Sequence, residues 1–205
     1  NLRNLIDGYY VNQMPGKTEQ WISVYLAAEY GTVPVEGTYF AEELIDADRE
    51  GRIGDVLPDK ALPVHTFWDM GVGDDMVLWF GQGTGGSWRW IDYYQNSGKL
   101  LSHYATVIAD RARERKWLIG REVWPHDGNV REMTALAQQM KADEAPRRCD
   151  VWSGLPGRDP VVLPNVPLSD SIEQGRLLVG VSRYDKTHCA EGLRRLRRYK
   201  RHLDK

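Results

Sequence analysis

The sequence contains only two cysteines, Cys149 and Cys189, and no CxxC pair. Neither a disulfide framework nor a cysteine-ligated metal site is therefore predicted, and two free thiols are typical of a reducing compartment. No apolar run approaches the length needed to cross a bilayer, and the run Met76–Phe80 is among the longest. The beginning of the chain also lacks a signal-peptide pattern. We expect no membrane partner and a cytoplasmic location.

Other absences narrow the class of protein further. The glycines between Gly81 and Gly86 have no lysine after them, so they indicate a hairpin turn rather than a phosphate-binding loop. A net charge of -2 does not mark the whole chain as a nucleic-acid binder, although it is compatible with a local basic face. Hydrophobic residues make up 41% of the 205 positions, enough for one packed α/β domain. The chain begins at Asn1 without an initiator Met, which suggests a piece of a longer protein.

Apolar periodicity and turn residues predict a mixed α/β sheet. Strands are predicted at 64–69, 76–82, 88–94, 117–124 and 161–163. Helices are predicted at 21–30, 40–48, 100–116, 131–141 and 172–178, with a last helix starting at 185 or 187. Short turns make the first three strands an antiparallel meander, and intervening helices make the later strands parallel. The result is a five-stranded mixed sheet flanked by helices, which is the order of elements of a ribonuclease H-like fold.

The first 60 residues differ from the remainder because they carry helix-like apolar spacing without strand signals. We expect residues 1–60 to be a mostly helical lead-in or linker and residues 61–205 to form the sheet domain. A packing appendage without a function of its own is the simplest interpretation of the lead-in.

Two aspartates follow strands that this topology places side by side. Asp69 ends the first strand, and Asp127 follows the fourth in the sequence WPHDG. Hydrolysis of a phosphodiester by two metal ions needs carboxylates that converge from neighbouring strands, and Mg²⁺ or Mn²⁺ prefers oxygen ligands. Each aspartate alone is also compatible with ordinary turn chemistry. Together they predict catalytic and metal-binding roles for Asp69 and Asp127.

Further candidates lie near these two aspartates and at the end of the chain. Asp92, in the third strand, is an auxiliary metal ligand, an outward strand residue or a helix-capping partner. His126 orients Asp127, touches a phosphate or bonds the backbone. The last predicted helix has an apolar stripe opposite a basic face. That face contains Arg194, Arg195, Arg197, Arg198, Lys200 and Arg201, of which Arg194, Arg197, Arg198 and Arg201 are the candidate DNA contacts. A solvated polar face is the alternative interpretation of these arginines.

Several stretches, in order, resemble the nuclease domain of the large terminase subunit of tailed phages, a ribonuclease H-like family that packages DNA. The stretch Phe67–Phe80 resembles its first acidic motif, and Trp124–Gly128 resembles its second. Ile91–Gly98 is similar to the intervening strand and turn, and Cys189–Tyr199 is similar to a helix near the end of the domain. The likeness extends from about Gly31 to Lys205.

The resemblance implies a two-metal endonuclease, dependent on Mg²⁺ or Mn²⁺, that cuts concatemeric double-stranded viral DNA in the host cytoplasm. It implies that ATP belongs to a motor domain preceding residue 1, and that the small terminase subunit and the capsid portal are partners. The family's third acid lies in a helix beyond the equivalent of Lys205, so we expect a truncated C-terminal end, weak metal binding and an inactive fragment. The alternatives are another ribonuclease H-like nuclease, such as a transposase or resolvase, and a non-catalytic DNA-binding or portal-docking module.

Overall fold

The computed structural model describes residues 37–71, 75–131 and 145–200. Within these ranges one sheet has the strand order β1-β7-β4-β3-β2-β5-β6. The strands are β1 (Ile53–Gly54), β2 (Val64–Met70), β3 (Met76–Gly83), β4 (Trp88–Asn96), β5 (Ile119–Trp124), β6 (Pro160–Val162) and β7 (Arg183–Asp185). The helices are α3 (Ala41–Arg49), α4 (Leu101–Arg115), α5 (Arg148–Ser153), α6 (Leu168–Val181), α7 (Ala190–Leu196) and the short 3-10 helix η2 (His126–Asn129).

The centre of the sheet is the antiparallel meander that the sequence predicts. β3 pairs with β2 on one side and with β4 on the other, antiparallel in both cases. The turn between β3 and β4 contains Gly85 and Gly86, whose φ angles of 69° and 120° favour glycine. The predicted hairpin and meander are therefore confirmed.

The remaining strands are parallel to the meander's outer strands. β5 pairs with β2, and β6 pairs with β5. On the other side β7 pairs with β4, and β1 pairs with β7. The mixed, ribonuclease H-like fold class is confirmed, but the sheet has seven strands rather than five within the described residues. β1 and β7 are too short to show a hydrophobic period, and Arg183–Asp185 is a strand where the sequence suggested a helix start.

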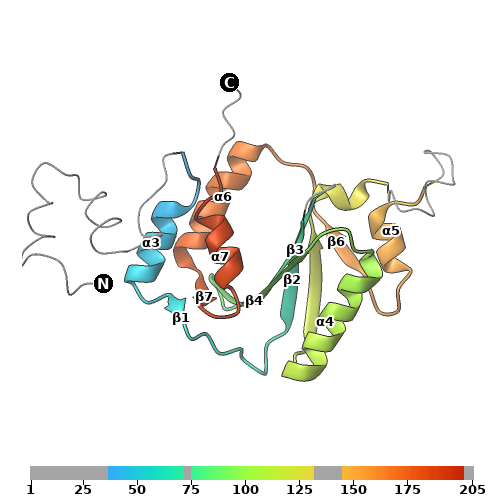
Figure 1. The fold of residues 1–205 in the computed structure, drawn as a ribbon, viewed down its shortest axis with the longest axis horizontal. Coiled ribbons are helices and arrows are strands. Elements are labelled where there is room, and N and C mark those ends of the chain that lie inside the picture. The colour runs from blue at the N-terminus through green and yellow to red at the C-terminus, as the bar shows by residue number, and fades with distance from the viewer. Residues whose placement is uncertain (1–36, 72–74, 132–144, 201–205) are drawn as a thin grey trace, which may run out of the picture.

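Helices cover both faces of the sheet (Figure 1). α4 and α5 lie over one face, where Trp68, Tyr104 and Trp152 belong to one buried cluster. α3, α6 and α7 lie over the other face, where Phe40 and Leu193 belong to a second cluster. The two clusters divide the sheet into an α4 face and an α7 face, and successive strand residues alternate between them except at register shifts such as the one between Phe80 and Gly81.

The predicted helices agree with the structure at several positions. α3 and α4 match the predictions at 40–48 and 100–116, and α6 is longer than the predicted 172–178. The predicted helix at 21–30, and the one at 131–141 apart from Arg131, fall outside the described residues. α3 packs on α6, and β1 extends the sheet beside β7; the domain division at residue 60 stays a prediction. In the described part of the chain, no helix is long and apolar enough to cross a membrane.

Candidate active site

The structure brings Asp69 and Asp127 to the same edge of the sheet. Asp69 is the last but one residue of β2, and Asp127 lies in η2, directly after β5. β2 and β5 run parallel, with Phe67 opposite Val123, so both strands deliver the residues that follow to one edge. The backbone of η2 is fixed by the Gly128 amide, which donates to the carbonyl of Pro125 at 3.0 Å.

The Asp69 carboxylate is in an unfavourable electrostatic environment. Burial raises the pKa of Asp69 above its ordinary value, and the negative charge of Asp127 raises this pKa further. Asp69 keeps an exposed surface, but the surrounding protein atoms displace enough water to make burial the larger cause. Among the described residues, the Asp69 side chain has neither a hydrogen-bond nor an ion-pair partner. A carboxylate without a counter-ion, beside a second carboxylate, favours the binding of a cation.

His126 lies beside Asp127. Its Nε2 atom is 3.2 Å from Asp127 Oδ1, and both side chains are about half exposed. Of the three contacts open to His126 from the sequence, the structure contains the one with the carboxylate. A ring nitrogen that donates to Asp127 would hold one of its oxygens in place and leave the other available.

Asp92, in contrast, is held on the other face of the sheet. Its Oδ2 atom is 2.9 Å from Arg111 Nε and 3.3 Å from Arg115 Nη1, both on α4. Burial raises the pKa of Asp92, and the two guanidinium charges oppose that rise. Asp69 lies on the α7 face, in line with Phe67. The structure therefore separates Asp92 from the Asp69–Asp127 pair, which corrects its expected position as an auxiliary ligand.

The cations of the last helix are less free than the sequence suggested. Arg194 pairs with Glu191, and Arg197 Nη2 is 3.9 Å from Asp48 Oδ2. Arg198 has no ion-pair partner among the described residues, and Arg201 lies outside them. The basic face is thus partly neutralised by carboxylates that helical periodicity alone does not reveal.

Arg195 belongs to the basic face that the sequence predicts, and its ion pairs connect this face to the start of β3. Arg195 Nη2 is 2.5 Å from Asp75 Oδ2, and Arg195 Nε is 3.2 Å from Glu191 Oε1. Asp75 directly precedes β3, whose residue Val77 is the register partner of Asp69. The i,i+4 spacing of Glu191 and Arg195 was a detectable signal, whereas the contact with Asp75 spans 120 positions.

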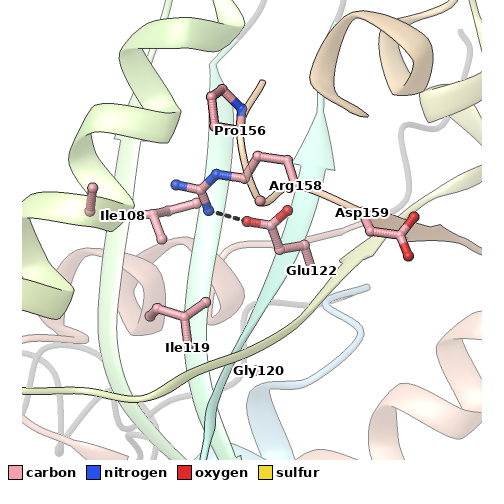
Figure 2. Close-up of a pocket in the computed structure, with 9 residues that line it drawn as sticks. Ile108, Ile119, Gly120, Glu122, Pro156, Arg158 and Asp159 are labelled. Atoms are coloured by element: carbon pink, nitrogen blue, oxygen red, sulfur yellow. Dashed lines mark hydrogen bonds and ion pairs between the residues drawn. The ribbon is translucent and has the colours of Figure 1, made fainter. Parts of the chain in front are cut away.

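A pocket of about 360 Å³ lies on the α4 face, away from these residues. Figure 2 shows Glu122 and Arg158 facing each other across it, joined by an ion pair, with Asp159 turned away. Trp152 Nε1 also donates to Glu122 Oε2 at 2.5 Å. Both oxygens of Glu122 therefore have partners, and the pocket offers no uncompensated carboxylate.

The described residues contain no group of three or more His, Cys, Asp or Glu side chains arranged to hold a metal ion. Asp69 and Asp127 therefore form an incomplete ligand set within the part of the chain that the structure describes, and their metal-binding role stays a prediction.

The described sheet and its helices define a ribonuclease H-like α/β domain with an acidic strand edge. No protein-family model and no curated protein matches the sequence. The fold is similar to the large terminase of a thermophilic bacteriophage. One crystal form of that terminase gives a TM-score of 0.55 at 11% identity, over 99% of this chain and 48% of that one. Another gives 0.53 at 15% identity, over 82% and 39%.

The large-terminase nuclease domain of bacteriophage SPP1 with bound Mn is also similar, at 14% identity over 75% of this chain and 80% of that one. Its TM-score of 0.49 is too low to support an argument. The chain spans less than half the length of the thermophilic phage's terminase. The chain thus folds like part of a phage large terminase, as the resemblance in sequence implied.

Proposed function

We propose that this chain is a metal-dependent endonuclease domain that cuts double-stranded DNA during viral genome packaging. The observation that carries the proposal is the placement of Asp69, which has no counter-ion among the described residues, with Asp127 at one edge of a ribonuclease H-like sheet. The fold shared with a phage large terminase supports the choice of DNA as the substrate. The small terminase subunit, the capsid portal and the host cytoplasm belong to the same proposal.

The donor chemistry of the site fits a hard divalent cation. Asp69 and Asp127 would hold Mg²⁺ or Mn²⁺, because both offer carboxylate oxygens and their repulsion ends when a cation lies between them. A metal ion bound there supplies a Lewis acid and an activated water for phosphodiester hydrolysis. Asp69 projects from β2, whose pairing with β3 and β5 sets the position of its backbone. Asp127 depends on the η2 turn and on His126 for its orientation.

Metal binding tests the site independently of cleavage. The chain is titrated with Mn²⁺ in a calorimeter and compared with Asp69→Asn and Asp127→Asn. A matched control is Asp159→Asn, which removes an exposed carboxylate at the pocket on the α4 face. We expect weak binding by the wild type, loss of binding in both site variants and no change in the control. Unchanged binding in both site variants refutes the proposed site.

Cleavage tests the activity itself. Supercoiled plasmid is incubated with the chain and Mn²⁺ or Mg²⁺, and nicked and linear products are separated on a gel. Cleavage that Asp69→Asn abolishes, and Asp159→Asn leaves intact, supports the endonuclease. DNA binding without metal binding points to the non-catalytic module instead.

A further inference from the structure

α7 packs tightly on the face of the sheet that carries Asp69. Phe67, Trp79 and Tyr93 are register partners on β2, β3 and β4, so they form one row across the α7 face. A Cβ added to Gly192 would lie 2.4 Å from the Trp79 ring and 2.5 Å from the Tyr93 ring. Only a residue without a side chain permits this approach, which fixes the height of α7 above the row.

The next row toward the strand ends contains Asp69, with Val77 as its register partner on β3 and Gln95 beyond that on β4. The Tyr93 hydroxyl donates to Gln95 Oε1 at 2.6 Å, so its ring extends into this row. Burial raises the pKa of Tyr93 to about 12, and the charges of Arg195, Glu191, Asp75 and Asp69 all act on this hydroxyl. The Tyr93 hydroxyl is therefore within electrostatic reach of both Arg195 and Asp69.

Arg195 lies one helical turn after Gly192 and reaches over that row. Its guanidinium contacts Asp75, which directly precedes β3. The β2–β3 ladder ends at the pair Met70 and Met76, so Asp75 lies at the same end of the two strands as Asp69. Arg195 is thus a cation placed at the acidic edge, and Asp75 and Glu191 hold its guanidinium from two sides.

The guanidinium of Arg195 has N–H groups that no carboxylate occupies. It carries five N–H groups in a planar fork. Nη2 contacts Asp75 and Nε contacts Glu191. The Arg195 side chain is 43% exposed.

A phosphate near Asp69, Asp75 and Asp127 is repelled by three carboxylates, so a bound DNA strand needs a cation among them. An arginine already held by two acids loses little rotamer entropy when it binds a phosphate.

We propose that Arg195 binds a backbone phosphate of the DNA strand that crosses the Asp69–Asp127 edge. This inference rests on the proposed function and assigns a phosphate-binding residue to it. The competing explanation is that Arg195 has only a structural role and stabilises the contact between α7 and the start of β3 through its ion pair with Asp75. The two explanations differ in how DNA affinity depends on salt.

Duplex binding is measured by fluorescence anisotropy in EDTA, so that no cleavage occurs, over a series of salt concentrations. The variants are Arg195→Ala and Asp75→Asn, and the matched control is Arg113→Ala, which removes an arginine paired with Asp110 on α4. We expect Arg195→Ala to weaken binding roughly tenfold. Its slope of log affinity against log salt should fall by about one, because one phosphate contact is lost.

Asp75→Asn separates the two explanations, because it removes the ion pair between Asp75 and Arg195 but keeps the positive charge of Arg195. We expect this variant and Arg113→Ala to keep the wild-type salt slope. A change of equal size in Arg195→Ala and Asp75→Asn overturns the inference, as does an unchanged slope in Arg195→Ala. Thermal unfolding of each variant excludes loss of the fold as the cause. If the wild type binds no duplex at low salt, the proposed function itself fails; if it binds and Arg195→Ala binds equally well, only this inference fails.

Discussion

Replacing Gly192 by Ala should destabilise the protein, although the same change usually stabilises a helix. The added Cβ would lie 2.4–2.5 Å from atoms of Trp79 and Tyr93, whereas ordinary contacts begin near 3.4 Å. α7 must therefore move outward by roughly 1 Å or force two rigid rings to shift. Overpacking of this kind costs about 1–3 kcal/mol, and two rigid rings on one side place Gly192 at the upper end of that range.

The helix gains about 1 kcal/mol when Gly becomes Ala, so the net loss in the free energy of unfolding is about 2 kcal/mol. For a domain of this size that loss lowers Tm by roughly 4–8 °C. Differential scanning calorimetry or circular dichroism measures the shift, and urea titration checks that the m-value is unchanged.

Gly180→Ala is the matched control, because Gly180 lies in α6 and an added Cβ there meets no atom within 4 Å. We expect this variant to be as stable as the wild type or up to about 1 kcal/mol more stable. If Gly192→Ala unfolds at or above the wild-type temperature, α7 does not pack against Trp79 and Tyr93 as described. The position of Arg195 over the Asp69 row would then lose its support as well.

Three more predictions concern buried or acidic groups. Glu122→Gln removes the counter-charge of buried Arg158 and should lower the free energy of unfolding by about 3 kcal/mol in a urea titration. Burial raises the pKa of the Cys189 thiol far above its usual range, so iodoacetamide at about pH 8 should modify the half-buried Cys149 and spare Cys189, as mass spectrometry would detect. The pKa of Asp69 is raised in the folded state, so its ionised form opposes folding at neutral pH; Asp69→Asn should raise Tm at about pH 7 and lose that advantage at about pH 3. A higher Tm for Asp69→Asn at both pH values would contradict the electrostatic explanation.

The meander and α4 could be predicted because each depends on local patterns, and the pairing of β2 with β5 followed from the ribonuclease H-like order of elements. Gly85 and Gly86 permit the turn, and the strands on both sides are long enough to show a period of two. β1 and β7 could not be predicted, because these two- and three-residue strands lack the apolar run that marks the equally short β6 and are stabilised by their neighbours. The Asp185 carboxylate does accept backbone N–H groups, from Thr187 and His188. That capping signal was interpreted as a helix start and concealed the strand that ends at Asp185.

The sequence predicts which acidic residues of the candidate site lie at strand ends, but it does not predict which residues form ion pairs with the acids. Asp69 and Asp127 follow predicted strands, so topology alone places them at one edge. The partners of Asp92 are Arg111 and Arg115, which only the packing of α4 on the sheet brings near. From the sequence, Asp92 is therefore as plausible a metal ligand as Asp69 or Asp127. Only the position of its counter-ions in the structure distinguishes it from them.

The distribution of counter-ions is the strongest physical argument for the site. On the α4 face, arginines neutralise both Asp92 and Glu122, two acids that are almost fully buried. Arginines are thus available to this fold wherever a buried charge must be compensated. At the edge, Asp69 has no such partner among the described residues, although desolvation and Asp127 both disfavour its charge. Groups whose pKa values are perturbed without a compensating partner concentrate at functional sites. A divalent cation would neutralise the Asp69 charge, and a DNA phosphate would complete the neutralisation of that cation.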